Sequence, residues 1–192
     1  MATTTFSPNQ LDKREQIIDA AKAVLISGGL RSCTTREVAD RSPLTRSAIH
    51  YYFDSIDEIV EAAMRSHLDD LISGLRAAGE GIEDPVERFW TVTRAYVEGF
   101  RDNEPLALLW WDYSINCVQE GRLDRVRDTE EAIGEALTEL LEGCGVENSE
   151  ARSRALLAYM IGTTMRQIIH QTEFGPVEAE LATLSGIPPR PR

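Results

Sequence analysis

Hydrophobic positions recur at helical spacing along almost the whole chain. Near the N-terminus, Ile17, Ala21, Val24 and Leu25 stand at positions i, i+4, i+7 and i+8, which is the spacing of one helix face. Gly28-Gly29 follows, and a glycine with positive φ can close the last turn of such a helix. The alternating pattern of half-buried strands is essentially absent, so the sequence predicts an all-α fold.

Two short helices are predicted after this first one. Thr34 and Glu37 have the spacing of a capping box, in which each side chain bonds to the other residue's backbone N–H. Pro43 cannot continue the helix that they open, because it lacks an N–H donor. Thr45 then provides an N-cap for a third helix over residues 46–53.

Longer amphipathic helices fill the rest of the chain. A fourth begins near Ser55 and carries one apolar stripe as far as Leu75. The pattern and its Gly, Pro and Asp breaks predict further helices over 85–101, 106–118, 121–142 and 149–174, and a short terminal one over 177–184.

The two short helices and their tight turn have the form of a helix-turn-helix. Only a small side chain fits where such helices cross, and Ala39 occupies that place, with Val38, Leu44 and Ile49 spaced to pack the corner. In a helix-turn-helix, the second helix enters the DNA major groove with its N-terminal residues toward the bases.

This geometry selects a set of candidate DNA contacts. Arg46 is the best candidate for a bidentate contact with guanine, because a guanidinium matches the O6 and N7 acceptors. Thr35, Arg36 and Tyr52 are candidates for phosphate contacts. The full set of predicted DNA-binding residues is Thr35, Arg36, Thr45, Arg46, Ser47, His50, Tyr51 and Tyr52.

In this region the chain resembles the tetracycline-repressor (TetR) family of transcription regulators. The resemblance is carried by about 45 residues, and no single motif in them is decisive. They comprise Arg14, Ile17-Ile18, Ala20-Ala21, Gly29-Leu30, Thr34-Thr35, Val38-Ala39, the run Leu44 to Ile49, Tyr52-Phe53, Ser55 and Asp57-Glu58-Ile59. The family places such a domain before a variable helical domain that dimerises and binds a small ligand.

The resemblance implies a domain organisation for the whole chain. We expect flexible tails at 1–10 and 187–192, a DNA-binding domain at 11–55, and an effector-binding and dimerisation domain at 56–186. By the same resemblance the protein is a homodimer, and the helices near 121–143 and 149–173 are our candidates for its interface.

Three positions depart from the family pattern. Pro43 stands where the family usually has a turn glycine, so the turn must close in a different way. His50 replaces a usual tyrosine, and Ile56 replaces a lysine that usually contacts phosphate. Loss of one phosphate contact weakens DNA binding and flattens its salt dependence by about one unit of slope.

The charge of the chain is unevenly distributed. The formal net charge of -12 would usually argue against DNA binding, since duplex DNA is itself densely negative. Residues 1–53, however, carry seven basic and five acidic residues, for a net charge of +2, and residues 54–192 carry -14. The sequence therefore predicts a mildly basic DNA reader on an acidic body.

Other classes of protein find little support in the sequence. No apolar run of about 18 residues is present, and the N-terminus lacks the pattern of a secretory signal. Three widely separated cysteines suit a reducing cytoplasm. No Walker loop, HExxH or G-x-S-x-G motif occurs, so we expect no catalytic residues, no bound metal, no cofactor and no enzyme activity.

The aromatic segment over 106–118 suggests an effector pocket. Successive residues diverge by about 100° around a helix, so Trp110 and Trp111 cannot both face one core. One of them faces a cavity or a dimer partner, and the alternative is an ordinary aromatic core stripe. The predicted effector-binding residues are Trp90, Tyr96, Phe100, Trp110, Trp111, Tyr113, Asn116, Met165 and Gln167.

The sequence thus predicts a ligand-responsive transcriptional regulator, a repressor released from a palindromic operator by a small-molecule effector. The alternative is a helical small-molecule-binding or adaptor protein that has lost specific DNA binding. Pro43, Ile56 and the overall acidity favour that alternative.

Overall fold

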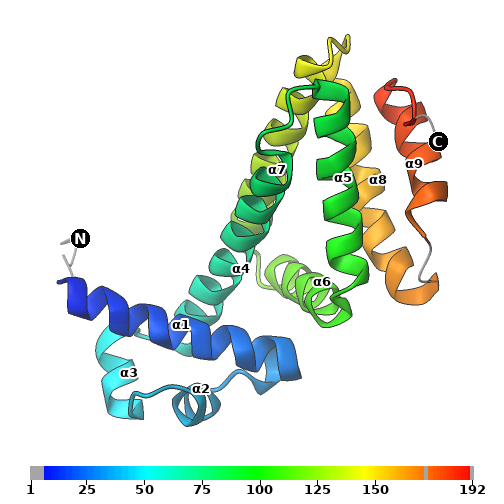
Figure 1. Ribbon diagram of the computed structural model, residues 1–192. Coiled ribbons are helices and arrows are strands. Elements are labelled where there is room, and N and C mark those ends of the chain that lie inside the picture. Colours follow the sequence, from blue (N-terminus) through cyan, green and yellow to red (C-terminus); the bar gives the residue numbers. More distant parts are fainter. Residues whose placement is uncertain (1–6, 171–172, 191–192) are drawn as a thin grey trace. The chain divides into compact units, whose positions relative to one another are not determined.

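The computed structural model describes residues 7–170 and 173–190, and these residues form helices joined by short turns (Figure 1). The predicted all-α fold is therefore confirmed. The α-helices are α1 (Pro8–Gly28), α2 (Thr35–Arg41), α3 (Arg46–Tyr52), α4 (Ile56–Gly79), α5 (Pro85–Arg101), α6 (Glu104–Gln119), α7 (Leu123–Gly143), α8 (Ser149–His170) and α9 (Phe174–Ser185), and a 3₁₀ turn, η1, spans Leu30–Ser32.

The chain forms two compact units, one ending at Asp70 and the other beginning at Leu71. This division lies further along the chain than the boundary expected at 55/56. The reason is that the first turns of α4 supply Ile59, Ala63 and Met64 to the buried side chains of the first unit. Helix α4 therefore begins in the first unit and ends in the second.

Caps and packing together hold the two short helices of the first unit. The Thr34 hydroxyl accepts the Glu37 N–H at 3.2 Å, and the Thr45 hydroxyl accepts the Ala48 N–H at 3.3 Å, so both predicted caps form. The second bond of the predicted capping box, from the Thr34 N–H to the Glu37 side chain, is absent. Val38 and Ile49 are completely buried. Since a seven-residue helix is unstable alone, this burial is what keeps α2 and α3 helical.

The turn that contains Pro43 closes without a positive φ angle. The Ser42 N–H donates to the Ala39 carbonyl at 3.3 Å, and the Ser42 hydroxyl accepts the Leu44 N–H at 3.1 Å. The serine side chain thus stabilises this turn by a hydrogen bond, whereas other turns use a glycine with a positive φ angle. Pro43 is compatible with the helix-turn-helix.

Arg14 of α1 fastens the end of α3 to the start of α4. Its guanidinium donates to the Tyr52 carbonyl at 2.8 Å, pairs with Glu58 at 3.3 Å and lies 4.0 Å from the centre of the Phe53 ring. These three contacts fix the direction in which the chain leaves α3.

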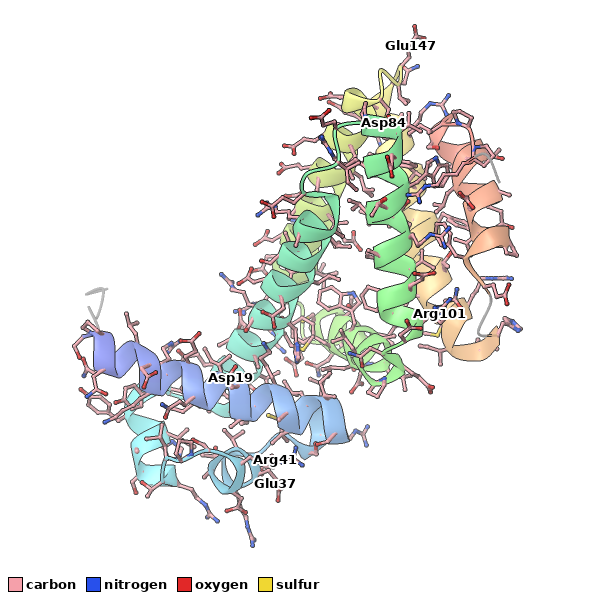
Figure 2. The ribbon with its side chains drawn as sticks, viewed as in Figure 1. Asp19, Glu37, Arg41, Asp84, Arg101 and Glu147 are labelled. Carbon is pink, nitrogen blue, oxygen red and sulfur yellow. The ribbon has the colours of Figure 1, made fainter. Side chains whose placement is uncertain are left out.

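Helix α8 is the centre of the second unit, where it packs against α5, α6, α7 and α9 (Figure 1). Figure 2 shows Asp84 at the start of α5 and Arg101 at its end. The Asp84 carboxylate accepts the Val86 N–H at 2.9 Å, and Pro85 occupies the first turn, which confirms the predicted start of this helix.

The boundary between α8 and α9 differs from the one that the sequence predicts. Gly175-Pro176 was expected to end the helix that starts at Ser149, but α9 begins at Phe174 and contains both residues in its first turn. A proline is tolerated there because the first-turn N–H groups have no partner within the helix.

Both expected tails are partly structured. Pro8 already belongs to α1, because Ser7 and Gln10 form a capping box at its N-terminus. At the other end, Ile187 is buried, and the Pro188 carbonyl accepts a 2.9 Å hydrogen bond from the indole N–H of Trp90. Within the described residues, the segment after α9 is therefore packed against α5.

We expect Trp90→Phe to lower the free energy of unfolding of the second unit by about 2–4 kcal/mol. The variant loses the bond to Pro188 and leaves a cavity at a position that is completely buried. Denaturant unfolding followed by circular dichroism measures this change. Trp111→Phe, at a half-buried tryptophan, is the matched control and should cost less. A loss below about 0.5 kcal/mol for Trp90→Phe would contradict the assigned packing.

Candidate functional site

Helix α3 presents a polar face to solvent. Arg46, Ser47, His50 and Tyr51 are all exposed, and Tyr51 has 66% of its surface accessible. These residues occupy positions i, i+1, i+4 and i+5 and therefore share one side of the helix. Ile49 lies on the opposite, buried side.

Arg46 is available to an external partner. No hydrogen bond or ion pair joins its guanidinium to the described residues, and its side chain is exposed. The neighbouring arginines of α2 differ from it: Arg36 lies 3.8 Å from Asp40, and Arg41 donates to the Ala23 carbonyl at 2.8 Å. Arg46 is thus the arginine of these two helices that has no bond to another described residue.

The other predicted contact residues of the first unit lie in different surroundings. The Tyr51 hydroxyl accepts a 3.0 Å hydrogen bond from the Gln10 amide, which orients an otherwise exposed ring. Tyr52 is only 9% exposed, and its ring packs edge-on against Tyr51. Thr35 is half-buried, and the exposed Thr45 uses its hydroxyl oxygen in the α3 cap.

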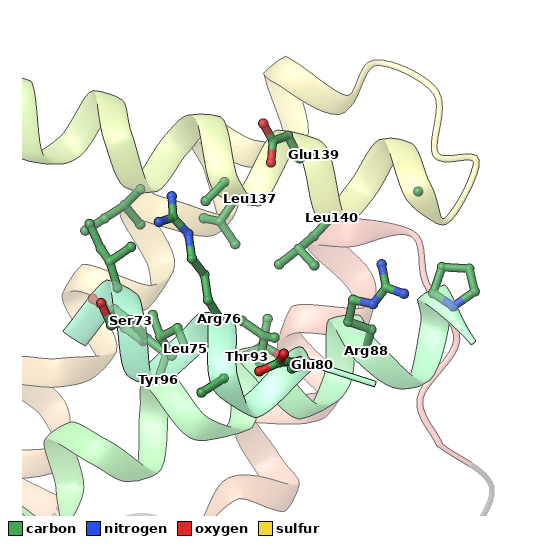
Figure 3. A pocket seen from close by; sticks show the side chains of 18 of the residues that line it. Ser73, Leu75, Arg76, Glu80, Arg88, Thr93, Tyr96, Leu137, Glu139 and Leu140 are labelled. Atoms are coloured by element: carbon green, nitrogen blue, oxygen red, sulfur yellow. The ribbon is translucent and has the colours of Figure 1, made fainter. Parts of the chain in front are cut away.

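The second unit contains a cavity of about 770 Å³. Figure 3 shows side chains of α4 and α5 on one side of it and those of α7 on the other. Most of the lining is apolar, and the volume lies within the range of small-molecule sites. Its buried members include Thr93 and Tyr96 of α5, Leu137 of α7 and Met160 of α8.

Of the nine predicted effector-binding residues, only Tyr96 lines this cavity. Trp90 and Phe100 are buried in the core of the second unit. Trp111 is half-buried and donates to the Thr164 hydroxyl at 3.3 Å, while Trp110 lies against the ring of Tyr113. Both tryptophans are thus half-buried in α6 and outside the cavity lining.

The remaining predicted residues also lie away from the cavity. Asn116 bonds to Glu120 and Arg122 at the end of α6, and Met165 is half-buried in α8. Gln167 is 3% exposed, and both polar atoms of its carboxamide lack a partner among the described residues. A buried amide in this state requires a water or another polar partner.

Sequence reasoning missed the cavity because it followed the aromatic residues. Large rings fill space, and Trp90 and Phe100 accordingly form core. The cavity lies where facing helices carry small residues. The signal in the sequence is the set of small side chains Ser73, Ala77, Gly79, Ala132, Ala136 and Gly143, all of which line it.

Metal-binding clusters and membrane-spanning helices are both absent from the described residues. Within 7–170 and 173–190, no group of three or more His, Cys, Asp or Glu side chains is arranged to hold a metal ion. None of the helices in the same ranges is both long and apolar enough to cross a membrane.

Comparison with known proteins relates this arrangement to a family. Residues 17–63 match the profile of the bacterial regulatory proteins of the tetR family. The HTH-type transcriptional repressor KstR2 of Mycobacterium tuberculosis is 23% identical over 116 residues, which cover 60% of this chain and 58% of that protein. The HTH-type transcriptional regulator BetI of Burkholderia cenocepacia is 25% identical over 174 residues, 88% of each chain.

A solved structure shares the fold over nearly the full length. The crystal structure of a transcriptional regulator from Rhodococcus sp. Rha1 superposes with a TM-score of 0.73 at 24% identity, covering 90% of this chain and 94% of that one. Residues 17–63 thus match the tetR family of bacterial regulatory proteins, and the chain shares the helical fold of this solved regulator.

Proposed function

We propose that this protein is a homodimeric, ligand-responsive transcription regulator that represses genes from a palindromic operator in the cytoplasm. The observation that carries the proposal is the exposed face of α3, on which Arg46 stands free at the first helical position. A guanidinium at the N-terminal end of a recognition helix can reach guanine O6 and N7 in the major groove.

The relatives support the same function. KstR2 is named a transcriptional repressor and BetI a transcriptional regulator, and both names specify the HTH type. The mildly basic charge of residues 1–53 agrees with DNA binding, whereas the net charge of -14 on the rest of the chain disfavours non-specific attachment to the duplex.

The cavity supports control by a small molecule. Helix α4 supplies Ile72, Leu75 and Arg76 to its lining, and the same helix begins in the unit that contains α3. A ligand that fits one position of α4 better than another shifts the population of DNA-competent dimers. The size of that shift is set by its difference in affinity for the two states.

The outward face of α8 is our candidate for the dimer contact. It carries small exposed residues at helical spacing, namely Ala151, Ala155, Ala158 and Gly162, which permit close approach of a second helix. The exposed residues of α7 are mainly acidic, among them Glu131 and Glu135, and would repel their own copies. Of the two predicted interface helices, α8 is therefore favoured.

Arg46→Ala should weaken binding to DNA from upstream of the gene by roughly 5- to 150-fold, because it removes one bidentate base contact of about 1–3 kcal/mol. Fluorescence anisotropy at fixed salt measures the dissociation constant. Arg127→Ala is the matched control, since it removes the same charge from an exposed position on α7. Equal effects of the two substitutions would refute base reading by Arg46, and no binding by the wild type would favour the adaptor alternative.

Gly162→Arg should convert the dimer into a monomer. A Cβ at the exposed Gly162 meets no atom within 4 Å, so the substitution starts in open space in its own protomer, and the long side chain obstructs a partner helix. Light scattering at micromolar concentration measures the mass, and circular dichroism confirms that the helices remain. Gly99→Arg on α5, which is equally unobstructed, should stay dimeric. A dimeric Gly162→Arg variant, or a monomeric wild type, would contradict the proposed interface.

A further inference from the structure

Tyr96 offers a polar group at the wall of the cavity. Tyr96 lies on α5, lines the 770 Å³ cavity and is 4% exposed. Its ring packs against Phe100 with the centroids 5.0 Å apart, which holds the ring in place. Among the described residues, nothing hydrogen-bonds to its hydroxyl. A hydroxyl without a protein partner at the wall of an apolar cavity can hydrogen-bond to a polar atom of a bound molecule.

Tyr96 is distinctive among the buried lining residues. Thr93 is the other buried hydroxyl there, and it already donates to the Phe89 carbonyl at 2.8 Å. The other buried side chains of the lining, Leu137 and Met160, have no strong donor or acceptor. The buried part of the described lining therefore offers a ligand one free hydrogen-bonding side chain.

The charged residues of the lining are not buried. Arg76, Glu80 and Glu139 are all solvent-exposed, and no ion pair joins them to one another (Figure 3). Arg88 is also exposed, and its guanidinium donates to the Ile82 carbonyl. No charged lining side chain is buried, so a charged ligand group taken into the buried part would find no counter-ion there.

The protonation state of Tyr96 agrees with this division. Burial raises the pKa of its hydroxyl far above the ordinary value of a tyrosine. The group therefore stays neutral at physiological pH, and it can both donate and accept a hydrogen bond.

We infer that the cavity takes an uncharged, largely apolar molecule with a hydroxyl or carbonyl oxygen, and that this oxygen hydrogen-bonds to Tyr96. This inference rests on the proposed control of the regulator by a small molecule. The effector is then an uncharged apolar molecule with an oxygen. Tyr96 favours it over apolar molecules that lack the oxygen.

Two ring compounds of the same shape test the inference. 2-Naphthol carries the oxygen and 2-methylnaphthalene lacks it, and displacement of the fluorescent apolar probe N-phenyl-1-naphthylamine measures the binding of each. Tyr96→Phe should weaken 2-naphthol binding by about three- to tenfold, the usual contribution of one neutral hydrogen bond, and leave 2-methylnaphthalene within twofold. In the wild type, charged 2-naphthoate should bind more weakly than 2-naphthol.

Tyr159→Phe is the matched control, because Tyr159 lies on α8 outside the lining and its hydroxyl bonds to Glu180. It should leave the affinities of all three compounds unchanged. Equal losses for 2-naphthol and 2-methylnaphthalene in Tyr96→Phe, or tighter binding of 2-naphthoate, would overturn the inference while ligand binding itself stands. Failure of the probe to bind the wild type would instead refute the ligand cavity of the proposed function, and the inference with it.

Discussion

The DNA-reading surface depends on two helices that cannot be stable by themselves. Helices α2 and α3 have seven residues each, shorter than the length at which an isolated helix persists in water. Their form is imposed from outside, by the buried side chains of Val38 and Ile49, by threonine caps at both N-termini and by the contacts of Arg14 at the end of α3. The polar groups on the outer face of α3 are thus positioned by the buried contacts on its inner face and by the bonds at its two ends.

In the second unit, large side chains form the core and small side chains line the cavity. Around α8 the large residues pack densely, and Trp90 even holds the segment that follows α9. Between α4, α5 and α7 the small residues leave space, so a cavity remains beside a well-packed core. Tyr96 belongs to both, since its ring packs against Phe100 and the residue lines the cavity. A ligand there contacts α4, the helix that the two units share.

Local signals in the sequence predicted most of the helix boundaries. Thr34, Thr45 and Asp84 act within one turn of their own position, and each one caps the helix it was expected to cap. Features that depend on distant contacts were not predictable in this way. The proline-rich segment after α9 has the composition of a loose tail. The indole N–H of Trp90, about a hundred residues earlier, nevertheless donates a hydrogen bond to it. The cavity likewise depends on which helix faces meet, whereas an aromatic stripe marks only where large side chains gather.

The central claim is that the first unit reads a specific DNA sequence and that the second controls it. Selection of bound genomic fragments by the purified protein tests this claim most directly, because it presupposes neither the operator nor the effector. We expect strong enrichment of a few fragments that share a palindrome with half-sites about one helical turn apart. Recovery of fragments without any shared sequence, at the level seen with no protein, would contradict it.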